Sequence, residues 1–379
     1  MKQKRLDFIA VKFVTFDTES FVQEVINYSS NSLIILFDVY KITLRYKPPD
    51  MSFPWNTFRL FTVDGEKRYG FTSLLMAILT VFFYIFLTSY LCIRYRPKIF
   101  WSHNLWTSWT AGLFKKIGMC DYTIHVASDW LVSSRKQPFV SYLANNIVFP
   151  IFDYLGCILS DLVLNSSEKI SESRQAYWGK RVEKHRIDYP LYFKIHDDIN
   201  KRERNRICFL GLVRNDSGLE LVIPLLYNLW EKYGIKLVII GWPSPHLKKI
   251  KELIVANNVQ EYVEFYSYLD YARLKEILDG CFCGLNLLTT TDSYSIYGIQ
   301  GKLVDYLQML IPIIVTDGVG PFAKVVQEKQ IGFVIKSTEE LAKAIEELYN
   351  NNLHYQNNIR NYILSRSPKK ISDYVYTGC

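Results

Sequence analysis

The stretch at 293–317 constrains the fold most, because a polar loop, a helix and an apolar strand follow one another there without a break. The loop contains Gly298 and Gly301, the helix starts near Lys302, and Pro312 ends it before the strand. The first amides of a helix are unpaired and lie at the positive end of its dipole, so they attract a phosphate group. The stretch therefore predicts a loop-helix-strand unit with an anion site at the start of its helix.

The residues at the start of this helix suit a nucleotide. Lys302 would place a point charge beside a pyrophosphate, and Asp305, one turn further on, would accept hydrogen bonds from ribose hydroxyls. Gly301 would let a ligand approach the chain closely, because glycine has no Cβ. A glycine-containing loop before a helix is a weak signal by itself, and an ordinary surface unit with solvated side chains accounts for it equally well.

The whole chain alternates apolar strands with helices, in two runs. A polar, basic stretch at 197–206 separates the first run from a second one, which begins with an apolar strand at 207–213. Alternation at this spacing predicts α/β architecture with parallel, doubly wound sheets. We therefore expect two Rossmann-like domains that face a cleft, at 1–198 and 199–354, with a helical stretch at 355–379 that returns to the first domain.

One predicted helix of the first domain is unusually apolar. Residues 71–93 contain no charged residue, and Lys67, Arg68, Arg94 and Arg96 flank them. This length suits a transmembrane helix, a buried crossover helix, or a helix with one face on the sheet and the other in the membrane surface. A span would separate strands that belong to one sheet. We therefore favour the helix that dips into the membrane surface, with its basic ends near anionic headgroups.

The composition excludes several classes of protein. Hydrophobic residues make up 49% and charged residues 22%, which indicates a globular chain. The net charge of +8 fits an anionic substrate or membrane, but no zinc spacing, RNP-like motif or Arg/Lys-rich block points to nucleic acid. The seven cysteines are irregularly spaced and no signal peptide is evident, so we expect reduced thiols in a cytoplasmic protein.

The motif-bearing stretches resemble family 4 (group 1) glycosyltransferases of the GT-B fold. The unit at 293–317 shows the family's Gly-Lys-Leu start to a helix, an acidic residue three places after the lysine, Tyr-Leu, and a proline before an apolar strand that ends near an aspartate. The matching residues are Gly301, Lys302, Leu303, Asp305, Tyr306, Leu307, Pro312 and Asp317. The glycine turn at 211–218 and the strand at 236–241 resemble the opening of the family's donor domain, and 161–167 resembles the last strand of its first domain.

The resemblance implies a donor-binding role for five residues of the second domain. Lys302 would bind the donor phosphates and Asp305 the ribose. Gly211 and Gly301 would let the backbone approach the nucleotide, and Arg214 would support phosphate binding. No Asp-x-Asp motif lies in a suitable loop, so we expect no obligatory metal.

In the first domain the candidates are polar residues that follow predicted strands. Asp129 sits where the family places a residue that faces the reacting sugar, and it would act as a general base or orient that sugar. His103 is the second catalytic candidate, and Ser166 and Trp242 also follow strands. We interpret His125, which lies inside a strand, as a hydrogen-bonded core histidine.

The resemblance implies transfer of a sugar from a UDP-, GDP- or dTDP-linked donor to a lipid-linked or polysaccharide acceptor. The protein would be held peripherally at the inner face of the membrane. The family often has a lysine where Ser217 stands and a carboxylate where Tyr297 stands. These differences keep a second interpretation open, namely a catalytically inactive GT-B protein that binds nucleotide or acts as a scaffold subunit. An epimerase on the same fold would have no use for the apolar helix.

Overall fold

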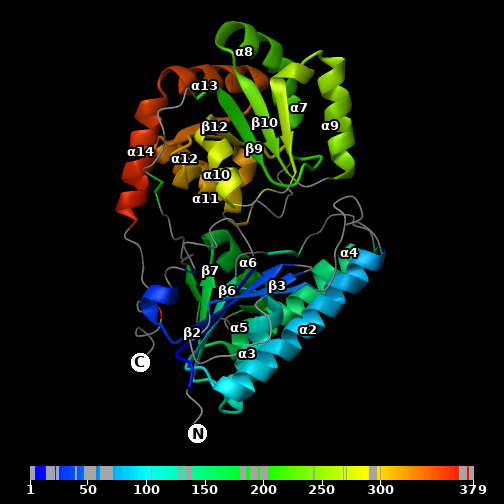
Figure 1. The fold of residues 1–379 in the computed structure, drawn as a ribbon, viewed down its shortest axis with the longest axis vertical. Coiled ribbons are helices and arrows are strands. Elements are labelled where there is room, and N and C mark those ends of the chain that lie inside the picture. The colour runs from blue at the N-terminus through cyan, green and yellow to red at the C-terminus, as the bar shows by residue number, and fades with distance from the viewer. Residues whose placement is uncertain are drawn as a thin grey trace. The chain divides into compact units, whose positions relative to one another are not determined.

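The computed structural model divides into two compact units, drawn in Figure 1. Unit 1 comprises residues 1–192 and 368–379, and unit 2 comprises residues 193–367. The structure describes residues 5–13, 22, 25–38, 41–46, 57–59, 71–103, 105–127, 130–132, 139–179, 185–187, 195–196, 204–241, 244–267, 269, 271–289, 297–298, 300–366 and 374.

Unit 1 contains one eight-stranded sheet. Its strands are β1 (Phe8–Phe13), β2 (Ser32–Asp38), β3 (Lys41–Tyr46), β4 (Thr57–Arg59), β5 (Ile99–Ser102), β6 (Tyr122–Ala127), β7 (Leu162–Asn165) and β8 (His185–Ile187). They lie in the order β4-β3-β2-β1-β5-β6-β7-β8. The six neighbouring strands β2-β1-β5-β6-β7-β8 pair in parallel, as the alternation predicts. The β2–β3 and β3–β4 pairs are antiparallel, an edge extension that the sequence did not indicate.

Helices cover both faces of this sheet. They include α2 (Phe71–Tyr95), α3 (Leu105–Lys116), α4 (Phe139–Leu143), the π-helical turn η2 (Ala144–Val148), α5 (Phe149–Leu159) and α6 (Glu168–Trp178). On one face, residues of α2 such as Leu87 and Leu91 pack with Ile9 and Phe100 of the sheet. On the other face, Tyr374 packs against Trp101, so this C-terminal residue belongs to the core of unit 1.

Helix α2 has one packed face and one exposed face. Tyr84, Leu87 and Leu91 are buried against the sheet, whereas Phe82 and Phe86 are 66% and 70% exposed. A wholly buried crossover helix therefore does not describe α2. Among the residues that the structure describes, no helix is long and apolar enough to cross a membrane.

Unit 2 contains a six-stranded sheet that is parallel throughout. Its strands are β9 (Arg206–Leu210), β10 (Lys236–Ile240), β11 (Val263–Tyr266), β12 (Cys281–Asn286), β13 (Ile313–Thr316) and β14 (Gly332–Ile335). Their order is β11-β10-β9-β12-β13-β14, so the direction of winding reverses between β9 and β12. In doubly wound sheets ligands bind beyond the carboxyl ends of the strands at this switch point.

The helices of unit 2 form a layer on each face of its sheet. They are α7 (Leu219–Val222), η4 (Ile223–Leu225), α8 (Leu226–Tyr233), α9 (Pro245–Ala256), η5 (Gln260–Tyr262), α10 (Tyr271–Asp279), α11 (Gly301–Gln308), η7 (Asp317–Val319), α12 (Pro321–Glu328), α13 (Thr338–Asn350) and α14 (Asn352–Ser365). The helices α7, α8, α9 and α13 share one core with alternate residues of β9 and β12. Helix α11 packs on the opposite face, through Tyr306 against Gly284.

The observed division falls at 192/193 and 367/368, whereas the sequence suggested 198/199 and 354/355. Helix α14 stays with unit 2 because Tyr355 packs into that unit's core and its ring contacts Phe333. The chain after residue 367 is the part that groups with unit 1.

Candidate functional site

The candidate site of unit 2 lies at the switch point of its sheet, where β9 and β12 are neighbours. Helix α11 begins at Gly301, and the side chain of its N-cap residue, Gln300, makes no capping hydrogen bond. A helix leaves its first amides without intrahelical partners, so an anion can bind them. A Cβ built on Gly301 would meet no atom of the described residues within 4 Å. The part of the chain that the structure describes therefore leaves the start of α11 accessible to an anion.

Lys302 is the second residue of α11 and is half-buried. Its Nζ lies 4.7 Å from the centre of the Phe209 ring, near the carboxyl end of β9. Burial, together with the nearby guanidinium of Arg214, lowers the pKa of Lys302 from 10.5 to about 7, while Asp216 acts in the opposite direction. The charged ammonium is thus disfavoured in the free protein, and an anion bound beside it would stabilise it.

The turn after β9 places a second cation near this lysine. Arg214 Nε lies 3.0 Å from Asp216 Oδ1, and the Arg214 amide donates a hydrogen bond of 2.7 Å to Ser217 Oγ. Gly211 and Gly218 have φ angles of +114° and +69°, which favour glycine. A Cβ on Gly218 would lie 2.4 Å from a carbonyl oxygen of the segment after β12. The two glycines thus let the turn bring Arg214 to the switch point.

Asp216 is a site residue that the sequence reasoning missed. Its side chain pairs with Arg214 and counteracts the lowering of the Lys302 pKa, although the residue is only 5% exposed. Its carbonyl oxygen accepts a hydrogen bond of 3.2 Å from the Thr289 amide, which joins the turn after β9 to the segment after β12. An aspartate in a polar turn is typical of turn formation, so its spacing carried no functional signal.

Tyr306 fixes α11 to the sheet. Its hydroxyl accepts a hydrogen bond of 2.9 Å from the Leu210 amide and lies 3.2 Å from the Cys208 carbonyl oxygen, to which it donates. Burial raises its pKa well above the ordinary value, so it remains a neutral donor. A Cβ on Gly284 would come within 2.6 Å of the Tyr306 ring, so the close approach requires glycine at that position. This contact holds α11, and with it Lys302, close to the sheet.

Asp305 occupies a different place from the two cations. Its carboxylate is buried and lines a small pocket between α10 and α11. The other residues of that pocket are Leu274, Lys275, Leu278, Gln308 and Met309. The structure therefore brings Lys302 and Arg214 together, and the ribose contact of Asp305 stays a prediction.

Two amide side chains near the switch point lack hydrogen-bond partners among the described residues. Asn286, the last residue of β12, is fully buried, and neither its Oδ1 nor its Nδ2 has a partner in the described part of the chain. The buried Nε2 of Gln300 also has none there. An unpartnered buried polar group costs about 1–3 kcal/mol, so such groups indicate a missing partner. A polar residue at the end of an apolar strand was the signal that could have identified Asn286.

The structure describes only some of the candidate site residues of unit 1. His103 directly follows β5, its amide donates to the Val11 carbonyl oxygen at 2.9 Å, and its ring lies 6.0 Å from the Trp101 ring. Asp129 follows β6 by two residues, and both Asp129 and Trp242 lie outside the described residues. The assignment of Asp129 and His103 as catalytic residues stays a prediction.

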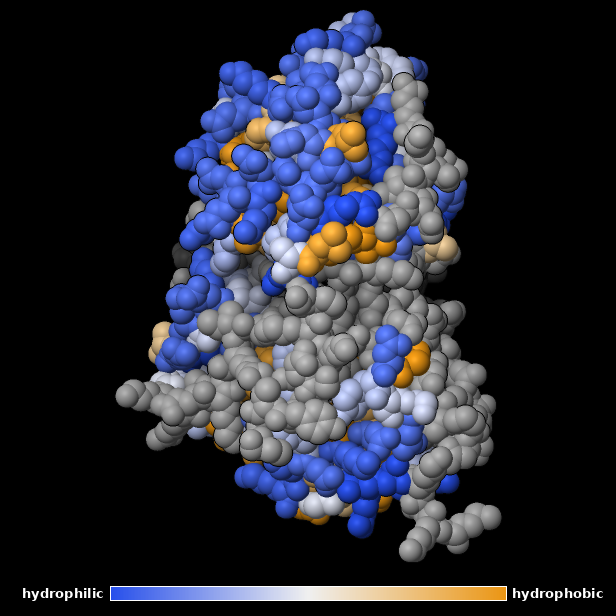
Figure 2. Space-filling model, turned by 90° about the vertical axis from the view of Figure 1, so that its left-hand side faces the viewer, coloured by the Kyte–Doolittle hydropathy of each residue, from blue (hydrophilic) through white to orange (hydrophobic). Residues whose placement is uncertain are grey.

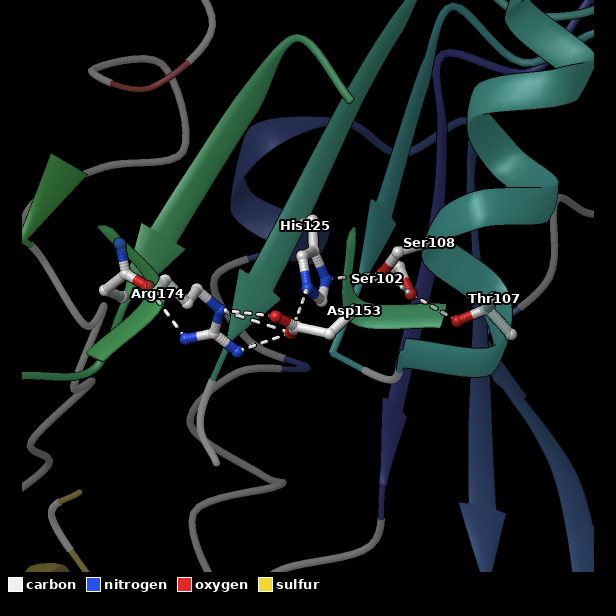
Figure 3. A network of polar contacts seen from close by, with 7 residues as sticks. Ser102, Thr107, Ser108, His125, Asp153 and Arg174 are labelled. Carbon is white, nitrogen blue, oxygen red and sulfur yellow. Dashed lines mark hydrogen bonds and ion pairs between the residues drawn. The ribbon is translucent and has the colours of Figure 1, made fainter. Parts of the chain in front are cut away.

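A buried polar network lies directly below these strand ends (Figure 3). His125 Nδ1 lies 2.5 Å from Ser108 Oγ, and its Nε2 lies 4.0 Å from Asp153 Oδ1. Arg174 binds the Asp153 carboxylate through Nε and Nη2, at 2.9 and 2.6 Å, and donates to Asn165 Oδ1 at 2.9 Å. His125 is therefore a buried, hydrogen-bonded histidine, as the sequence predicts.

The network keeps one ion pair and one neutral imidazole. Burial lowers the pKa of His125, and the Asp153 carboxylate only partly opposes this effect. Burial would raise the pKa of Asp153, but Arg174 outweighs it and holds the value at about 2. The ligand atoms of His125, Asp153 and Cys157 lie within 4.8 Å of one another. A metal ion there would face the guanidinium that occupies the carboxylate, so this group does not fit a cation site.

Comparisons with known proteins agree with this architecture. Residues 193–366 match the family of glycosyl transferases, group 1. Sucrose-phosphate synthase from Thermosynechococcus elongatus has a TM-score of 0.62 at 12% identity, with 95% of this chain and 94% of that chain covered. Anabaena HepE, solved in complex with UDP-glucose, has a TM-score of 0.60 at 13% identity, with 96% of each chain covered. S. aureus MnaA, solved with UDP, has a TM-score of 0.55 at 12% identity, with 93% of this chain and 91% of that chain covered.

Comparison with curated protein sequences finds no match. At these identities the likeness to the solved structures concerns the fold.

Proposed function

We propose that this chain transfers a sugar from a nucleotide-sugar donor to a lipid-linked or polysaccharide acceptor, because residues 193–366 match the group 1 glycosyl transferases and the chain shares the fold of sucrose-phosphate synthase and HepE. The observation that carries the donor half of the proposal is the convergence of Lys302, Arg214 and the start of α11 at the switch point of unit 2.

The donor diphosphate would bind at the start of α11. Both Lys302 and Arg214 are cations, and the leaving diphosphate gains negative charge as the glycosyl bond breaks. Lys302 gains stability when an anion arrives, because burial and the neighbouring guanidinium disfavour its charge in the free protein. Since HepE was solved with UDP-glucose, UDP-sugars come first among the UDP-, GDP- and dTDP-linked donors.

The acceptor hydroxyl would be activated from unit 1. Asp129 would serve as the general base or orient the reacting sugar, and His103 would assist it. Both follow neighbouring parallel strands, β6 and β5, whose carboxyl ends meet at one edge of the sheet. Asp305 would bind the ribose.

The lipid-linked acceptor is suggested by the exposed face of α2. Large apolar side chains recur on it every three or four residues, which places them on one side of the helix. They are Ile78, Leu79, Phe82, Phe86, Tyr90 and Ile93. Two exposed arginines, Arg94 and Arg96, follow at its carboxyl end. An apolar face beside basic residues suits the surface of an anionic membrane, so we place the protein peripherally on that surface, at its cytoplasmic side.

The surface of unit 2 offers a contrast to α2. Figure 2 shows that the face of unit 2 carrying α13 and α14 is largely hydrophilic, with scattered apolar spots and one larger apolar patch towards its lower edge. Leu353 and Leu364 of α14 are exposed there singly. Single exposed apolar residues are ordinary on soluble surfaces, whereas a continuous row marks an interaction site.

One observation favours the second candidate function, a nucleotide-binding or scaffold subunit without transferase activity. The family often has a lysine where Ser217 stands, and here Ser217 Oγ accepts a hydrogen bond from the Arg214 amide. Asp216 also pairs with Arg214 and reduces the charge available to a diphosphate.

A donor screen tests the proposal. Purified protein is mixed with UDP-, GDP- and dTDP-sugars and a lipid extract, and nucleotide release is followed for the wild type, Lys302→Ala and the matched control Lys248→Ala, which alters an exposed lysine of unit 2. Release that needs lipid and is lost only in Lys302→Ala is the expected result. Nucleotide binding without release would favour the scaffold function. No nucleotide binding would refute the assignment of the site.

A further inference from the structure

The buried network of unit 1 joins residues of five elements. Ser102 comes from β5, Ser108 from α3, His125 from β6, Asp153 from α5 and Arg174 from α6. Each of these five residues is at most 1% exposed. Figure 3 shows them side by side beneath the strands, with Ser102 and Thr107 in contact at the far end from Arg174. No substrate can reach these groups, so the serine, histidine and aspartate do not act as a nucleophilic triad.

The network is attached to the ends of three parallel strands. Ser102 is the last residue of β5 and lies 3.1 Å from Ser108 through their hydroxyl oxygens. His125 lies two residues before the end of β6. Asn165 is the last residue of β7 and accepts a hydrogen bond from Arg174. A change in the network therefore reaches the ends of β5, β6 and β7 together.

The candidate acceptor residues begin where these strands end. His103 directly follows β5, Asp129 follows β6 by two residues, and Ser166 directly follows β7. The Ser166 amide also donates a hydrogen bond of 3.2 Å to the carbonyl oxygen of Ala127, which ties the end of β7 to the end of β6. The positions of His103 and Ser166 therefore depend on strand ends that the network holds.

We propose that His125, together with the Asp153–Arg174 ion pair, is a positioning network for the acceptor side of the reaction, and that protonation of His125 releases the ends of β5, β6 and β7. The proposal rests on the glycosyltransferase function proposed above. His125 acts here through the strands and does not touch the substrate.

The direction of the effect follows from the groups that face His125. Asp153 and Cys157 face it from α5, Ser108 from α3, and Arg174 stands on the far side of the Asp153 carboxylate. Burial lowers the pKa of His125, so it is neutral at neutral pH. When it is protonated, the imidazolium competes with Arg174 for Asp153, and its Nδ1 becomes a donor that Ser108 must accept. Both changes disturb contacts that hold the strand ends.

The first test compares wild type with His125→Gln across pH 5 to 8. In the wild type we expect the acceptor-dependent rate to fall on the acid side of the His125 pKa. In His125→Gln the group no longer titrates, so this acid limb should disappear, the rate at neutral pH should drop about tenfold or more, and UDP affinity should change less than about twofold. His354→Gln, which alters an exposed histidine of unit 2, is the matched control. An acid limb that persists in His125→Gln, or an equal loss of UDP affinity, would overturn the proposal.

The second test does not depend on activity. Hydrogen exchange of the backbone amides at 122–127 and 162–166 is measured at pH 5 and pH 8. Rates are corrected for the intrinsic exchange rate, which is itself slower at pH 5, and compared as protection factors. We expect lower protection factors at pH 5 than at pH 8 in the wild type and no such difference in His125→Gln. If that variant does not fold, Ser108→Ala removes the Nδ1 contact and should give lower protection factors than the wild type at both pH values. Equal protection factors at the two pH values in the wild type would refute the release, whereas an absence of transferase activity with the expected protection factors would refute only the proposed function.

Discussion

Replacing Lys302 by methionine should stabilise unit 2 while removing its affinity for a nucleotide. The pKa of Lys302 falls from 10.5 to about 7, because burial and Arg214 disfavour its charge. At about 1.4 kcal/mol for each pH unit, this bounds the cost of the charged lysine at about 5 kcal/mol. The side chain is only half-buried and lies over the Phe209 ring, so screening and the cation–π contact reduce the gain to about 1–2 kcal/mol.

The pH dependence gives the sign of this effect. The pKa of Lys302 is lower in the folded than in the unfolded chain, so the unfolded chain binds more protons between pH 10.5 and about 7. The wild type therefore loses stability as the pH falls through this window, and the loss is complete below about pH 7. Lys302→Met removes the titrating group. Its advantage over the wild type should be full at pH 7 and should shrink towards pH 10.

Thermal unfolding at pH 7 and at pH 9.5 measures this difference. For a domain of this size, about 1–2 kcal/mol corresponds to a rise in Tm of about 3–6 °C at pH 7. Calorimetry with UDP should show at least a tenfold weaker Kd for Lys302→Met. Lys248→Met, at an exposed position, should change neither quantity. A Lys302→Met protein that is less stable than the wild type, or that binds UDP equally well, would refute the reasoning.

The remaining predictions concern other groups of the two units. Calorimetry of wild-type UDP binding should show Kd rising up to about tenfold per pH unit between pH 7 and 9, because the bound diphosphate requires charged Lys302; the Met variant should show no such slope. Asn286→Leu should raise the free energy of unfolding by about 1 kcal/mol in urea, since it removes a buried amide that has no partner among the described residues. Asp153→Asn should lower the free energy of unfolding by about 3–5 kcal/mol, because the buried guanidinium of Arg174 loses its counter-charge. Phe86→Glu should reduce sedimentation with anionic vesicles, whereas Leu353→Glu should not.

The sequence predicted the architecture because its signals are local. Apolar runs that alternate with helices predict parallel strands, and the helix at 71–93 was evident from its lack of charge. The strand β3, which lies between β2 and β4, was missed because Lys41, Thr43 and Arg45 alternate with apolar residues beside a Pro-Pro loop. Such a short alternating run is typical of an antiparallel strand but also of a connection.

The candidate site was predictable only where one local motif contains it. Gly301, Lys302 and Tyr306 belong to a single helix unit, so the sequence identified them, although the hydrogen bonds of the Tyr306 hydroxyl could not be read from it. The pairing of Asp216 with Arg214 depends on the geometry of a turn. The network around His125 depends on contacts between helices and strands that lie far apart in the sequence. Such contacts follow from packing, and no spacing of residues in one chain encodes them.

The polar groups at the strand ends of the two units differ in how well they are satisfied. In unit 2, the charge of Lys302 is disfavoured, so this residue contributes unfavourably until an anionic ligand binds beside it. In unit 1, Asp153 and Arg174 satisfy each other, and His125 is neutral beside them. Removing a group whose charge only a bound ligand stabilises, such as Lys302, should stabilise the free protein. Removing a group that holds other side chains in place, such as Asp153, should destabilise it. The sign of the stability change therefore separates binding residues from positioning residues before any substrate is known.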